Sequence, residues 1–177
     1  FILPSCKALS GINGVAISYS NCGWSGQPST SSVGYPQRAI EILESEVCPD
    51  ILLMPNGSPN SHTTITSTNI GIERYYLAQV IDMCSEKGVT PVIWSFLPSN
   101  SSIDVPVGSK NYGATDSLRI ALNQEVLGWR EKGLTVVDFS TILNGTINAN
   151  GQIPMATGTT TDGIHPSDSG NARLTNI

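Results

Sequence analysis

The stretch Asp50-Ile-Leu-Leu-Met-Pro-Asn-Gly57 decides the fold, because it joins an apolar run to a polar turn that contains glycine. The run shows no alternation of polar and apolar residues, which is typical of a parallel strand buried on both faces. Cys48-Pro49 ends the helical segment that precedes this run. We therefore predict a buried strand over residues 51–54, followed by a loop from Pro55 to about Thr68.

Three further apolar runs of strand length alternate with segments of helical period. The predicted strands are Gly14–Ser18, Thr90–Ser95 and Leu134–Asp138. The predicted helices span residues 36–47, about 70 to a stop at Lys87-Gly88, and 115 to an end at Lys132-Gly133, with a last one capped by Ser167 or Asp168. Their predicted inward faces are Ala39, Ile40, Leu43 and Val47; Ile70, Leu77, Val80, Ile81 and Cys84; and Leu118, Ala121, Leu122, Val126 and Trp129. This order predicts an α/β fold with three α/β/α layers around a flavodoxin-like parallel sheet.

Length and charge narrow the classes of function. The 177 residues predict one domain over 1–177. The net charge of −5 comes with no basic cluster, which excludes nucleic acid as an expected partner. No apolar run approaches the roughly 20 residues of a membrane span, so no membrane partner is expected.

Cysteines and sequons leave the compartment undecided. The four cysteines lie far apart without a C-x-x-C pair, so the sequence predicts neither a zinc site nor a redox motif. Their even number permits disulfides, but free and mostly buried thiols are the simpler interpretation. Sequons begin at Asn56, Asn100 and Asn144. A secreted, virion or cell-surface protein is compatible with these features.

Three polar loops should meet at one edge of the sheet. In parallel sheets ligands bind beyond the carboxyl ends of the strands, and residues 21–29, 55–60 and 161–166 hold the unusual polar and glycine residues. Each loop alone is more often structural than functional. Their combination makes them the candidate site.

In this order the loops resemble the SGNH (GDSL-like) hydrolase family. Asp162-Gly-Ile-His165-Pro is the most specific match, Gly26 corresponds to the second conserved block of the family, and Asn60 to the third. The likeness runs from about Gly14 to the end of the chain. It implies an α/β/α fold, acyl-transfer chemistry, and no metal or organic cofactor.

The resemblance also implies a role for each matched residue. His165 would accept the proton of an attacking serine, and Asp162 would orient the imidazole. The Gly26 N–H and the Asn60 amide would stabilise the oxyanion. Because Gly57-Ser-Pro-Asn60 is one residue longer than the spacing usual in the family, Asn56 is an alternative to Asn60.

The nucleophile of the family has no counterpart at its usual place. No Gly-Asp-Ser occurs in the chain, and Phe1–Ser10 resembles the end of the helix that follows that motif. We expect the serine upstream of Phe1, in a longer protein of which this chain is a segment. Ser5 is a weaker alternative, because only 21 residues separate it from Gly26, too few for a nucleophile turn, a crossover helix and a strand.

The expected function is that of a serine esterase or deacetylase. It would hydrolyse small acyl esters, plausibly O-acetyl groups of a carbohydrate, through an acyl-enzyme. Trp24 and Trp94 are candidate sugar contacts, although Trp94 also fits a core position, and His62 either borders the cleft or is an exposed loop residue. The rivals are a non-catalytic glycan- or receptor-binding module that keeps the fold, and a flavodoxin-like nucleotide binder.

Overall fold

A computed structural model of the chain describes residues 9–10, 16–17, 34–57, 67–98, 113–149, 151–161, 163 and 165–175. Its elements, in chain order, are β1 (Leu9–Ser10), β2 (Ala16–Ile17), α1 (Tyr35–Glu44), β3 (Ile51–Pro55), α2 (Ser67–Lys87), β4 (Thr90–Trp94), α3 (Gly113–Gly128), the 3-10 helix η2 (Trp129–Lys132), β5 (Thr135–Val137), α4 (Phe139–Leu143) and α5 (Asp168–Thr175). Among the described residues, no helix is long and apolar enough to cross a membrane.

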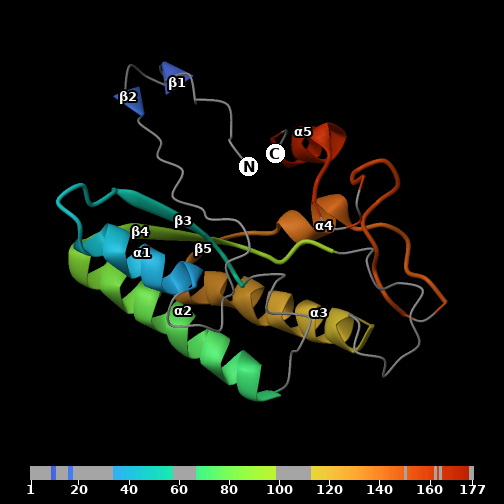
Figure 1. The fold of residues 1–177 in the computed structure, drawn as a ribbon, viewed down its shortest axis with the longest axis horizontal. Coiled ribbons are helices and arrows are strands. Elements are labelled where there is room, and N and C mark those ends of the chain that lie inside the picture. The colour runs from blue at the N-terminus through green and yellow to red at the C-terminus, as the bar shows by residue number, and fades with distance from the viewer. Residues whose placement is uncertain are drawn as a thin grey trace.

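Strands β3, β4 and β5 lie side by side in that order and form a parallel sheet (Figure 1). Leu53 pairs with Val92, which in turn pairs with Thr135. The hydrogen bonding continues beyond the end of β3, where the Asn56 N–H donates to the Trp94 carbonyl at 2.8 Å. The α/β class, the parallel sheet and three of the predicted strands are confirmed.

The predicted strand at Gly14–Ser18 does not join this sheet. Only Ala16–Ile17 is extended there, and it pairs antiparallel with Leu9–Ser10, with Leu9 opposite Ile17. The two segments are close in sequence, so a hairpin needs only a short loop, whereas parallel pairing with β3 needs a crossover connection. The prediction of a parallel strand at this position is wrong for the described structure.

The sheet is covered by helices α1, α2 and α3 on one face (Figure 1). Met54 and Ile93 point to that face and are 2% and 0% exposed. Ile51 and Leu53, which alternate with Met54 along β3, are 58% and 52% exposed. The prediction that β3 is buried on both faces is therefore wrong for the described residues. Helices α1, α2 and α3 pack against the face of Met54, and the side chains that alternate with Met54 are exposed.

The helix ends follow their sequence signals. Pro36 stands in the first turn of α1, where a missing N–H costs no hydrogen bond. Gly88 and Gly133 follow α2 and η2 with φ of 71° and 88°, a left-handed conformation that glycine adopts without strain. Ser167 Oγ accepts a hydrogen bond from the Gly170 N–H at 3.3 Å, so the predicted cap of α5 is confirmed.

The buried faces of helices α1 and α3 differ from the predicted ones. The predicted first helix was to reach Val47, but α1 ends at Glu44 and Val47 is 86% exposed. On α3, Leu122 and Val126 are buried as predicted, whereas Ala121 is exposed. The buried stripe of α3 instead includes Arg119 and Asn123, two polar residues that a hydrophobic pattern does not count.

The core lies between the sheet and these three helices. Leu77, Val80 and Cys84 of α2 are each 0% exposed, which confirms the predicted face of that helix. The buried cluster comprises Ala39, Leu43, Met54, Leu77, Val80, Cys84, Val89, Ile93, Val126 and Val136. This cluster packs against the helix-covered face of the sheet. It thereby fixes the positions of the carboxyl ends of the strands.

Candidate functional site

The carboxyl edge of the sheet begins with Asn56, directly after β3. Its side chain is 0% exposed, and its Nδ2 donates to the Leu122 carbonyl at 3.3 Å and to Asn123 Oδ1 at 3.4 Å. Its Oδ1 accepts from Arg74 Nη1 at 2.5 Å. Both amide protons are thus used inside the fold, which argues against Asn56 as the oxyanion donor and for a structural role.

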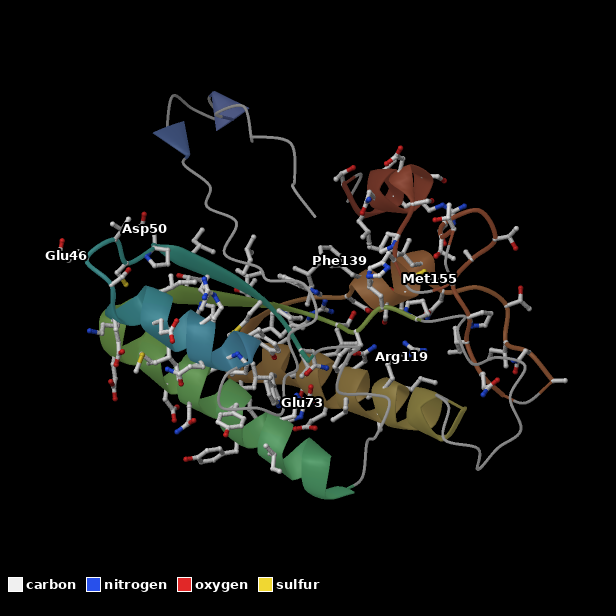
Figure 2. The ribbon with its side chains drawn as sticks, in the orientation of Figure 1. Glu46, Asp50, Glu73, Arg119, Phe139 and Met155 are labelled. Atoms are coloured by element: carbon white, nitrogen blue, oxygen red, sulfur yellow. The ribbon has the colours of Figure 1, made fainter. Side chains whose placement is uncertain are left out.

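Gly57 is needed for close packing at the same edge. A Cβ built on Gly57 would overlap the Glu73 carboxyl group and the Phe96 ring. Glu73 belongs to α2 and is 1% exposed (Figure 2). A carboxyl group is therefore packed against the turn that follows β3, a position where burial of a charge is costly unless it is paired.

Tyr35 supports this turn from α1. Its hydroxyl donates to the Pro55 carbonyl at 3.0 Å. Burial first of all, and then the charge of Glu73, raise the pKa of Tyr35 far above its usual value, although the Arg74 charge lowers it. Tyr35 is therefore a neutral hydrogen-bond donor that supports the turn after β3.

A second network ties the ends of β4 and β5. Ser95 Oγ and Ser140 Oγ donate to Asp138 Oδ1 at 2.9 and 2.7 Å, and the Ser140 N–H donates back to Ser95 Oγ at 2.8 Å. Thr141 Oγ1 donates to Asp138 Oδ2 at 3.0 Å, so Asp138 caps α4. Burial raises the pKa of Asp138, but the hydrogen bonds from Ser140, Ser95 and Thr141 outweigh it and leave the pKa below 3.8.

This network predicts an acid-dependent contribution to stability. Because the folded-state pKa of Asp138 is lowered, its contribution is complete above its ordinary pKa of 3.8 and is lost as the pH falls through the folded-state value. In Asp138→Asn the amide oxygen still accepts hydrogen bonds but carries no charge. We expect the free energy of unfolding of the variant to lie below wild type at about pH 6 and the difference to shrink towards about pH 2.

Urea unfolding at several pH values measures that difference. Asp50→Asn is the matched control, because Asp50 is exposed; its difference from wild type should vary less with pH. If the difference in free energy of unfolding between Asp138→Asn and wild type stays constant down to about pH 2, the role given to the carboxylate is contradicted.

His165 lies in a closed turn in front of α5. Thr160 and Pro166 form an antiparallel bridge, and the Ser167 N–H donates to the Thr159 carbonyl at 2.8 Å. Gly163 has φ 80°, and its N–H donates to Thr160 Oγ1 at 2.9 Å. The His165 side chain is exposed. The turn therefore presents the imidazole to solvent from a backbone that is fixed at both ends.

This turn lies on the carboxyl side of the sheet. Helix α4 begins one residue after β5 and packs against α5, which the turn precedes. A hollow of about 550 Å³ lies beside the preceding loop, between residues 144–146 and 154–157. Its lining contains no charged side chain. Thr159 Oγ1 donates a hydrogen bond to the carbonyl of Ala156, one of the lining residues, at 2.6 Å.

The structure describes one of the predicted site residues, His165. Gly26, Asn60, Asp162 and the alternative nucleophile Ser5 lie outside the described residues. So do the accessory candidates Trp24 and His62. The grouping of the base, its orienting carboxylate and the oxyanion donors therefore stays a prediction.

The remaining candidates are described in part. Trp94 is half-buried and contacts the Phe139 ring, with centroids 6.2 Å apart. Cys48 and Cys84 are free, the first exposed and the second buried; Cys6 and Cys22 lie outside the described residues. Within the part of the chain that the structure describes, no three metal-ligating side chains gather.

Hydrophobic patterning missed Arg74, Glu73 and Asn123. All three are polar residues on helices, a composition that usually indicates a solvated face. Asn123 is one position from the predicted inward residue Leu122, and this neighbourhood is the signal that would have marked it.

Comparison with known proteins places the fold. No protein-family profile matches the sequence, and no curated protein matches it significantly. Two crystal structures are similar to it. One is a protein described as an acylhydrolase from Bacteroides fragilis, at 17% identity and TM-score 0.60, covering 86% of this chain and 68% of that chain. The other is a GDSL-like lipase from Bacteroides thetaiotaomicron, at 16% identity and TM-score 0.62, covering 85% and 68%. The chain thus has the predicted fold of SGNH (GDSL-like) hydrolases.

Proposed function

We propose that this chain forms the acid–base and oxyanion part of a serine esterase that hydrolyses small acyl esters, with O-acetylated carbohydrate as the substrate class. The observation that carries the proposal is the His165 turn, which presents an exposed imidazole on the carboxyl side of a GDSL-like fold. In sheets of this kind the catalytic groups gather at that edge.

The reaction follows from the roles of these groups. A serine Oγ attacks the ester carbonyl carbon while His165 accepts the serine proton, and the carbonyl becomes a tetrahedral oxyanion. The Gly26 N–H and the Asn60 amide donate to that oxygen. The alcohol leaves with the proton from His165, and water then attacks the acyl-enzyme by the same route. Asp162 fixes the tautomer of the imidazole. These reaction steps need no metal and no organic cofactor.

The nucleophile would come from a segment upstream of Phe1. Strand β3 is an edge of the three-stranded sheet and pairs only with β4 among the described residues. Its Ile51 and Leu53 side chains are more than half exposed. An added parallel strand beside β3 would cover this edge, and the loop after that strand would reach the same carboxyl side as His165.

The uncharged hollow between residues 144–146 and 154–157, on the loop that leads to the His165 turn, supports an ester whose alcohol portion is neutral. Asn144, Thr146 and Thr157 supply polar groups to its lining, and sugar hydroxyls are bound through such groups. We place the carbohydrate part of the ester there.

The experiment is to read the upstream sequence and label the longer protein with a fluorophosphonate, which bonds to an activated serine as fluoride leaves. We expect a strand followed by Gly-Asp-Ser and a label on that serine. A label on Ser5 would place the nucleophile within this chain and overturn the upstream assignment. Absence of both label and aryl acetate hydrolysis would favour the glycan- or receptor-binding module.

A further inference from the structure

Arg74 joins three parts of the fold through separate atoms. Its Nη1 donates to Asn56 Oδ1 at 2.5 Å, its Nη2 to the Leu122 carbonyl at 3.3 Å, and its Nε to Glu125 Oε2 at 3.1 Å. The guanidinium also lies 5.4 Å from the centroid of the Trp129 ring. Each nitrogen has its own acceptor, and a planar guanidinium holds such a set in fixed geometry.

The network continues from Asn56 to the end of β4. Asn56 Nδ2 donates to Asn123 Oδ1, and the Asn123 amide forms two hydrogen bonds with the backbone of Phe96. The Phe96 N–H donates to Asn123 Oδ1 at 2.7 Å, and Asn123 Nδ2 donates to the Phe96 carbonyl at 2.9 Å. Asn56, Asn123 and Phe96 are 0%, 4% and 5% exposed. One chain of buried polar groups therefore connects the residues at which β3 and β4 end.

These hydrogen bonds lie at the carboxyl edge of the sheet, in the turns that follow β3 and β4. The loop that follows β3 starts at Asn56, and Phe96 is the second residue of the loop that follows β4. The hydrophobic cluster fixes the strands through Met54 and Ile93, but it includes neither Asn56 and Gly57 nor Phe96. The Arg74 network fixes these turns relative to α2 and α3. The side-chain amides of Asn56 and Asn123 are buried, so a shift of either turn that left them unpaired would cost free energy.

We propose that Arg74 is a positioning residue for the esterase site. Through Asn56 it holds the turn after β3, and through Asn123 it holds the turn after β4, so that groups carried by these loops stand in the reactive geometry. The inference rests on the proposed function for its catalytic consequence, whereas the fixing of the two turns is measurable in this chain without any reaction.

The test replaces Arg74 with lysine. Arg74→Lys keeps the positive charge and can keep the pair with Glu125. It replaces three nitrogens, each bonded to a different acceptor in fixed geometry, with one ammonium group that lacks this geometry. For the longer protein that carries the serine, we expect kcat to fall about 10- to 100-fold with little change in KM, because misplacement of catalytic groups by about 1 Å has an effect of that size. Hydrogen exchange of peptides that contain Asn56–Gly57 and Phe96 should accelerate in the same variant.

Two controls separate positioning from general stability. Arg130→Lys removes another bond from an arginine to a backbone carbonyl, that of Nε to Val136 O at 2.9 Å, away from both turns. Glu125→Gln removes the ion pair alone. Both should leave kcat near wild type. If kcat in Arg74→Lys stays unchanged, or falls no further than in Arg130→Lys, the positioning role is refuted. If hydrogen exchange is faster in Arg74→Lys but the wild-type protein does not hydrolyse the ester, the proposed esterase function is refuted and the turn-fixing role of Arg74 stands.

Discussion

Replacing His165 with alanine is expected to lower kcat for aryl acetate hydrolysis at least about 1000-fold, an effect typical of removing the base of a serine triad. The serine hydroxyl is a weak nucleophile until a base takes its proton, and the leaving alcohol needs a proton in return. His165 is the one histidine in the described part of the chain, and its side chain is exposed on a turn with both ends bonded. The loss should appear in kcat more than in KM, because proton transfer does not bind the ground state.

The other histidine of the chain, His62, provides the control. His62→Ala removes an imidazole from the segment between β3 and α2, and we expect it to keep nearly wild-type activity, since no proton transfer is assigned to His62. Circular dichroism and urea unfolding of both variants would show that the fold persists, since the exposed His165 side chain is not part of the core. Wild-type activity in His165→Ala would refute the role of His165 as the general base, whatever serine the upstream segment contains.

Local signals predicted the elements better than they predicted their packing. Apolar runs located β3, β4 and β5, and Gly88 and Gly133 located the ends of α2 and η2, because these features act over a few residues. Helix α4 was missed because five residues show no period, although Asp138 stands before it as a cap. The exposure of Ile51 and Leu53 depends on which elements lie next to β3, which is a property of the whole fold.

The candidate site shows the same division. The sequence singled out the segment that contains His165, and within it Gly163 adopts a left-handed φ of 80°. In contrast, sequence spacing left Asn56 and Asn60 as alternatives, and only the hydrogen bonds of Asn56 to Leu122 and Asn123 show that its amide is engaged. Partners 66 and 67 residues apart along the chain leave no local signal.

Replacing Gly170 with alanine is expected to destabilise the protein by about 1–3 kcal/mol, the range for forcing atoms into a packed region. Gly170 lies in the first turn of α5, and a Cβ there would overlap the Thr159 carbonyl oxygen and stand 3.1 Å from Pro166 Cβ. The first obstacle is backbone, so α5 must shift away from the loop. That loop ends in the His165 turn, and we therefore expect kcat to fall as well as the midpoint of urea unfolding.

Gly71 supplies a matched substitution with the opposite expected sign. It lies within α2, its position is exposed, and a Cβ there meets nothing within 4 Å. Because alanine is a better helix former than glycine, Gly71→Ala should stabilise by about 0.5–1 kcal/mol. Both variants add one methyl group to a helical glycine, so helix propensity cannot explain opposite signs. Equal stabilisation of the two would show that α5 does not pack on Thr159 as closely as the structure has it, and the fixed backbone of the His165 turn would lose its main support.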